Sequence, residues 1–196
     1  MTQAVPTIDP ARSALLIMDY QAGILDRMPS AGELLGLAAT TIGWFRERGG
    51  QIGYVRVAFD DKDFEDVPAT SRMGQRILAG GRTYHTDSPA TAIPGAIAPQ
   101  DGDIVVRKIR VGAFSTTDLD QQLRGRGIDT LILAGISTSG VVLSTVRDGH
   151  DRDYQLFVLS DLTADPDPAT HEFLMTTVLP RQADIITTAD LGQLVS

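Results

Sequence analysis

Cysteine is absent from this chain of 196 residues. Without a thiol the chain can form no disulfide bond, bind no metal through a thiolate and use no cysteine nucleophile.

Positive charge is in the minority, with 17 Lys and Arg against 25 Asp and Glu and a net charge of −8 at pH 7. Since this sign repels phosphate backbones and anionic lipids, we expect neither a nucleic acid nor a membrane as partner. Long apolar runs are missing too: the longest, residues 14–18, is far too short to span a bilayer. Residues 1–12 hold two prolines, an acid and one positive charge, which is untypical of a signal peptide. We therefore expect a cytoplasmic protein.

Apolar residues make up 42% of the chain, enough for a buried core. Short apolar segments alternate with segments of helical spacing, which predicts strands that alternate with helices. The predicted strands are 13–19, 52–59, 103–108, 130–134, 155–160 and 185–187, and the main predicted helices are 30–48, 117–126, 139–152 and 167–179. This alternation predicts a parallel sheet covered on both faces. We expect one α/β domain over residues 1–196.

The stretch between the second and third predicted strands, residues 60–102, is rich in proline and glycine and holds one weak helical segment at 73–78. Long irregular segments in compact domains are usually binding loops or lids. We therefore expect this stretch to contact a ligand.

Charged and polar residues follow three of the predicted strands. Asp19 ends the first strand, Lys108 ends the third, and the sequence GISTSGVV at 135–142 leads from the fourth into a helix. Ligands of parallel sheets bind beyond the carboxyl ends of the strands, where these groups would meet. Lys108 would favour the ionised form of Asp19, and burial would favour the neutral form. The amides that open the helix could bind an oxyanion or a carboxylate. The alternative is a structural ion pair beside an ordinary helix start.

The chain resembles the isochorismatase-like hydrolase family, which includes isochorismatases, nicotinamidases and other amide hydrolases. The resemblance extends from about residue 13 to 190, and its motifs are LLIMDYQ (15–21), GDIVVRK (102–108) with Ala113, Phe114 and Thr117, LILAGIST (131–138), STVRD (144–148) and PRQAD (180–184). It implies a three-layer α/β/α sandwich around a six-stranded parallel sheet. It also implies a homodimer or homotetramer that acts on a small molecule.

Most members of this family use an Asp, a Lys and a Cys. Asp19 and Lys108 match the first two, but the position of the cysteine is occupied by Val141. Thioester chemistry is therefore excluded. Isochorismatases of this family also lack the cysteine. They need no nucleophilic thiol, because a carboxylic acid can protonate the enol-ether carbon and water can then attack the resulting cation. We expect a hydrolase of a small carboxylated enol ether, with Asp19 and Lys108 as catalytic residues. The alternatives are an amide or ester hydrolase with water activated by Asp19, and a ligand-binding pseudoenzyme.

Amidases of this family can hold a metal just after the second strand, through an Asp and closely spaced histidines. Residues 59–64 contain no histidine here, so we expect no metal and no cofactor, and a solvated acidic loop at Asp60, Asp61 and Asp63.

Further residues are candidates for substrate binding. Gln21 could orient the Asp19 carboxylate or a water, or only fix a loop. His85 could reach the substrate from a lid, although an exposed loop histidine is the plainer interpretation. Arg110 could bind an anionic substrate, whereas Arg107 should point to the opposite face of its strand from Lys108.

The turn before the predicted helix at 139–152 supplies the remaining candidates. Ser137, Thr138 and Ser139 could hydrogen-bond the substrate or cap the helix, and no histidine lies near enough in the sequence to activate them as nucleophiles. Gly140 and Val141 would line the pocket.

Overall fold

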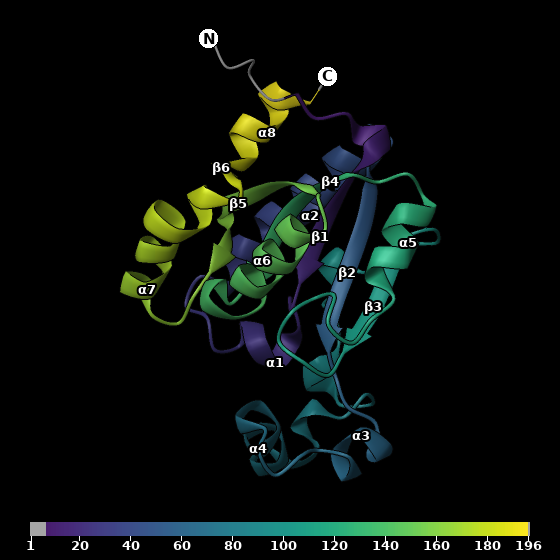
Figure 1. Ribbon diagram of the computed structural model, residues 1–196, viewed down its shortest axis with the longest axis vertical. Coiled ribbons are helices and arrows are strands. Elements are labelled where there is room, and N and C mark those ends of the chain that lie inside the picture. The colour runs from purple at the N-terminus through teal and green to yellow at the C-terminus, as the bar shows by residue number, and fades with distance from the viewer. Residues whose placement is uncertain (1–6, 196) are drawn as a thin grey trace.

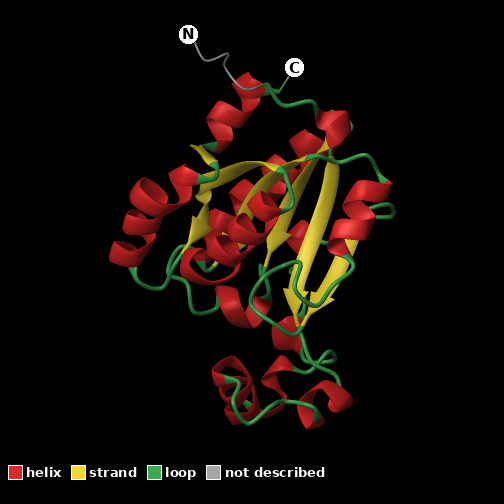
Figure 2. Ribbon diagram, in the orientation of Figure 1, coloured by secondary structure: helices red, strands yellow, loops and turns green. Residues whose placement is uncertain are grey.

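The computed structural model describes residues 7–195. Residues 1–6, part of the segment in which we expect no signal peptide, lie outside the described residues, as does Ser196. One sheet forms the centre, with strands in the order β3-β2-β1-β4-β5-β6 and every pair parallel (Figure 2). The strands are β1 (Ser13–Met18), β2 (Gln51–Val57), β3 (Ile104–Lys108), β4 (Thr130–Ile136), β5 (Gln155–Ala164) and β6 (Asp184–Ile186). The predicted six-stranded parallel sheet is confirmed.

Helices cover both faces of this sheet, as the prediction of an α/β sandwich requires (Figure 2). The α-helices are α1 (Ala22–Leu25), α2 (Ala31–Glu47), α3 (Asp61–Glu65), α4 (Arg72–Ala79), α5 (Leu119–Gly125), α6 (Leu143–Asp151), α7 (Pro168–Phe173) and α8 (Thr188–Leu194). Strand β1 is buried along its whole length. Its Leu15 and Ile17 pack with α2 and α8, and its Leu16 and Met18 pack with α5 and α6. This two-sided burial explains why β1 is a continuous apolar run.

Several predicted boundaries differ from the structure for local reasons. Strand β1 ends before Asp19 because Asp19 has a φ of +60°, which an extended strand cannot accommodate. The helix predicted at 139–152 begins one residue earlier, as a π-helix (Thr138–Val142) that runs into α6. Ser30 makes no side-chain cap bond to α2, whereas Asp167 caps α7 as predicted.

The long segment after β2 is more ordered than its composition indicates. It forms α3 and α4, followed by the short 3-10 helices Gly81–Tyr84, Pro89–Thr91 and Gly95–Ile97. Figure 1 shows α3 and α4 beyond the carboxyl ends of β2 and β3, set apart from the other helices. None of the helices within residues 7–195 is long and apolar enough to cross a membrane.

Candidate active site

Asp19 and Lys108 meet at the carboxyl edge of the sheet. Asp19 directly follows β1 and donates its backbone N–H to Val55 O of β2 at 2.8 Å, while Lys108 ends β3 on the far side of β2. The Lys108 ammonium donates to Asp19 Oδ2 at 2.8 Å and to the backbone carbonyl of Val111 at 2.6 Å. The ends of three adjacent strands therefore hold one acid and one amine in contact.

This pair is buried, with side-chain exposures of 9% for Asp19 and 2% for Lys108. Burial raises the pKa of Asp19 above the usual value of an aspartate, and the charge and hydrogen bond of Lys108 oppose this shift only in part. The second carboxyl oxygen, Oδ1, is buried and has no hydrogen-bond partner among residues 7–195. Asp19 can thus carry a proton on Oδ1 while Lys108 holds Oδ2.

The pair lines a cavity of about 300 Å³, a size that suits a small ligand. Besides Asp19 and Lys108, the lining consists of Ile24, Val57, Met73, Arg76, Ile77, Tyr84, Val111, Ile136, Ser137, Gly140 and Val141. Most of these side chains are apolar, so the few polar groups would determine how a ligand is oriented.

The turn after β4 forms one wall of the cavity through Ser137, Gly140 and Val141. Val141 is buried and offers the cavity only methyl groups. A Cβ on residue 140 would lie 2.8 Å from Ser137 Oγ, so the hydroxyl keeps its place because residue 140 is a glycine. The residues that line the cavity therefore include two with hydroxyl groups, Ser137 and Tyr84, and none with a thiol.

Several polar groups of this turn are already hydrogen-bonded within the protein. Ser139 donates its backbone N–H and its hydroxyl to Asp165 Oδ2, at 2.8 and 2.7 Å. The Thr138 hydroxyl lies 2.7 Å from His171 Nδ1, and the Gly140 N–H donates to Ser137 O. The prediction that the amides of this turn bind a substrate oxyanion is therefore wrong for Ser139 and Gly140, and neither Thr138 nor Ser139 lines the cavity.

Gln21 fixes a loop and does not orient the Asp19 carboxylate. Its Nε2 donates to the carbonyls of Val57 and Thr91, both at 2.9 Å, and its Oε1 accepts the Val57 N–H at 2.8 Å. This amide is saturated, so Gln21 ties the end of β2 to residue 91 and does not line the cavity.

His85 and Arg110, which were also predicted to contact the substrate, do not line the cavity. The expectation of an exposed loop histidine is wrong: His85 is buried, and its ring stacks against Phe64. Arg110 donates to the carbonyl of its neighbour Ile109.

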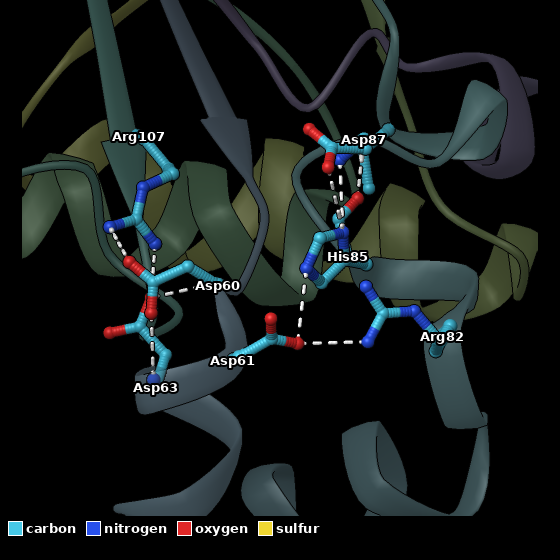
Figure 3. Close-up of polar contacts among 8 residues, drawn as sticks. Asp60, Asp61, Asp63, Arg82, His85, Asp87 and Arg107 are labelled. Carbon is cyan, nitrogen blue, oxygen red and sulfur yellow. Dashed lines mark hydrogen bonds and ion pairs between the residues drawn. The ribbon is translucent and has the colours of Figure 1, made fainter.

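The acidic residues after β2 do not form a free, solvated loop. Asp60 and Asp63 form a capping box at the start of α3, and both pair with Arg107 (Figure 3). Arg107 thus points away from Lys108, as the strand alternation predicts, and its guanidinium lies where a cation bound by these acids would sit. Nowhere in residues 7–195 do three His, Cys, Asp or Glu side chains gather in a way that could hold a metal ion.

The long segment brings to the cavity several residues that were not predicted from the sequence. Helix α4 contributes Met73, Arg76 and Ile77, and Tyr84 follows it. Met73 and Ile77 are four residues apart and so share a helix face, with Arg76 beside them. That spacing was the available signal. The side chain of Arg76 forms no ion pair with any residue from 7 to 195, so its charge is available to a ligand.

Comparison with known proteins identifies the family to which this α/β sandwich belongs. The family model "Isochorismatase domain" matches residues 13–190. The chain is 37% identical over 174 residues to the uncharacterized isochorismatase family protein YwoC of Bacillus subtilis, which covers 89% of each protein. It is 32% identical over 193 residues to the phenazine biosynthesis protein PhzD of Pseudomonas fluorescens, covering 94% of this chain and 86% of PhzD. The chain belongs to the isochorismatase family, whose members are hydrolases.

Two further matches differ in how much of the chain they cover. An isochorismatase family protein from Burkholderia thailandensis has a similar structure, with a TM-score of 0.81, 30% identity and coverage of 97% of this chain and 98% of that one. Ureidoacrylate amidohydrolase RutB of Methylorubrum extorquens is 43% identical, but over 97 residues, which are 50% of this chain and 37% of RutB.

Proposed function

We propose that this protein hydrolyses a small carboxylated enol ether, with Asp19 as the acid and without a covalent intermediate. The observation that carries the proposal is the state of Asp19. Its carboxyl group is buried in the cavity with a raised pKa, and one oxygen is held by Lys108 while the other has no partner among the described residues. Val141 occupies the position at which a thiol would be needed for amide hydrolysis through a thioester.

Each step of the reaction uses groups that line the cavity. Protonated Asp19 gives the proton on Oδ1 to the terminal carbon of the enol ether, which leaves an oxocarbenium ion. Water attacks the cationic carbon and returns a proton to the Asp19 carboxylate. The resulting hemiketal breaks its carbon–oxygen bond and releases a ketone and an alcohol. Lys108 stabilises the carboxylate during the interval in which Asp19 is ionised.

The position of Arg76 favours a substrate that carries a carboxylate. It lines the cavity from α4, and its guanidinium forms no ion pair with any residue from 7 to 195. An arginine can bind a carboxylate through two parallel hydrogen bonds. Isochorismate, which carries carboxylates and an enol ether, has the required chemistry. The similarity to a probable isochorismatase of Pseudomonas chlororaphis, 31% identical over 191 residues, favours the same choice.

Amide hydrolysis is the second candidate, favoured by the similarity to RutB. In this case Asp19 would act in its ionised form and remove a proton from water, while Val141 would only line the cavity. A raised pKa of Asp19 favours the acid role over this one.

The test measures the turnover of isochorismate and of ureidoacrylate by the purified protein and by Asp19→Asn, which keeps the side-chain volume but holds no acidic proton. We expect isochorismate to be hydrolysed and the variant to lose at least about a hundredfold in kcat, the lower part of the range for general acid catalysis. The control, Asp101→Asn at an exposed position, should keep full activity. Turnover of ureidoacrylate alone, or near-normal activity of Asp19→Asn with an unchanged circular dichroism spectrum, would refute the proposal.

A further inference from the structure

Residues 60–84 leave the sheet and return to it at the same place. Phe59 donates its N–H to Tyr84 O at 2.8 Å, and Thr86 donates its N–H to Phe59 O at 2.9 Å, so Phe59 and His85 form a parallel bridge outside the main sheet. Between these points the chain forms α3 and α4. We call residues 60–84 the lid. This closed excursion lies beyond the strand ends (Figure 1), and four of its residues line one side of the cavity.

The lid and the sheet contribute different groups to the cavity. Met73, Arg76 and Ile77 come from the lid, whereas Asp19 and Lys108 come from the strand ends. The distance from the free guanidinium to the reacting acid therefore depends on how the lid is attached. A lid that is less firmly attached would therefore weaken the binding of the substrate by Arg76.

Arg107 joins the lid to the sheet through side-chain contacts. It is next to Lys108 on β3, and its guanidinium donates to Ala58 O at 3.0 Å and pairs with Asp60 at 3.3 Å and with Asp63. The Arg107 side chain is 35% exposed and that of Asp63 only 17%, so solvent screens this contact incompletely. One guanidinium thus joins the strand that carries the catalytic lysine to the first turn of the lid.

A second polar contact lies between the two ends of the lid and is weaker. Asp61 pairs with Arg82 at 2.8 Å and lies 3.4 Å from His85 Nε2, which ties the two ends of the lid to each other (Figure 3). The Asp61 and Arg82 side chains are 74% and 68% exposed, and ion pairs in such positions contribute little. This contact also closes the lid on itself without joining it to β3.

We propose that Arg107 is a positioning residue: it fastens the lid to β3 and thereby holds Arg76 at the distance from Asp19 and Lys108 that the substrate requires. The kinetic part of this inference rests on the proposed function, and the attachment of the lid does not.

The kinetic test compares Arg107→Met with Arg107→Lys. Methionine keeps the stem but removes every donor, so we expect the KM for isochorismate to rise about fivefold while kcat changes less than about twofold. Lysine keeps the charge but cannot reach all three acceptors in a planar fork, so it should restore part of the affinity. The control is Arg12→Met, which removes the ion pair with Asp129 at the other end of β1. An unchanged KM in Arg107→Met, or an equal change in Arg12→Met, would overturn the proposal.

Hydrogen–deuterium exchange tests the attachment without any substrate. In Arg107→Met the amides of residues 61–84 should exchange faster, while those of β1 and β4 keep the exchange rates of the wild type. Unchanged exchange in the lid, or faster exchange throughout the sheet, would show that Arg107 does not fasten the lid. If the wild type does not hydrolyse isochorismate, the proposed function fails, and the exchange result alone still decides whether Arg107 holds the lid.

Discussion

Replacing Lys108 with methionine tests the physical state of the acid–amine pair most directly. Methionine has a similar length, so the cavity wall keeps its shape while Asp19 loses the charge and the hydrogen bond of Lys108, which lower its pKa. The carbonyl of Val111 also loses a donor, which costs about 1 kcal/mol at any pH.

The remaining loss of stability depends on pH, with a sign that follows from the burial of Asp19. In Lys108→Met the folded-state pKa of Asp19 lies well above the unfolded value of about 3.9, so stability falls as the pH rises from that value to the folded pKa. At pH 5, keeping the carboxyl protonated costs about 1.5 kcal/mol. At pH 8 the cost approaches the roughly 3–5 kcal/mol of a buried ion that has lost its partner.

Urea denaturation at pH 5 and pH 8 measures this difference. Lys108→Met should lose about 1.5–3.5 kcal/mol more at pH 8 than at pH 5. The double variant Asp19→Asn/Lys108→Met, in which no charge is buried, should recover most of the stability at pH 8 and lose the difference between the two pH values. Equal destabilisation of Lys108→Met at both pH values, or no recovery in the double variant, would contradict the idea that Lys108 counters the cost of burying the Asp19 carboxylate.

Two other substitutions separate binding from folding. Arg76→Met should raise the KM for isochorismate about tenfold or more, because a charge-assisted hydrogen bond contributes about 1.5–3 kcal/mol, while Arg72→Met one turn earlier on α4 should not; equal KM values in the two variants would rule out Arg76 as the carboxylate anchor. Gln21→Leu should destabilise the protein by about 3 kcal/mol in urea, because three buried hydrogen bonds are lost. The reacting groups do not include Gln21, so the folded variant should keep its kcat, and a large fall in kcat at full folding would assign Gln21 to the chemistry.

The sheet could be predicted from the sequence because its strands are nearly continuous apolar runs. Residues 13–18 and 130–134 are buried on both faces, and such burial leaves a pattern that does not depend on distant residues. Asp19 and Lys108 could be placed together for the same reason, since the carboxyl ends of parallel strands meet at one edge.

The other wall of the cavity could not be predicted, because it depends on where a long segment returns. Arg76 and Tyr84 reach the cavity only because Phe59 pairs with residues 84–86, and no local pattern encodes that pairing. Gln21 was ambiguous for a related reason: its partners lie 36 and 70 residues away, so its saturation is visible only in the folded chain. Likewise, the amide of Ser139 is taken by Asp165, 26 residues further along the chain.

Val141 has a consequence for the conditions under which this protein can work. Alkylating reagents and peroxide inactivate thiol-dependent hydrolases by attacking the nucleophile itself, and the branched hydrocarbon at this position gives them nothing to modify. The oxidisable atom in the cavity wall is the sulfur of Met73, which belongs to α4 and takes no part in proton transfer. Oxidation of Met73 would therefore change how the substrate binds and leave the groups that transfer protons unaltered. Methionine sulfoxide reductases could reverse this oxidation.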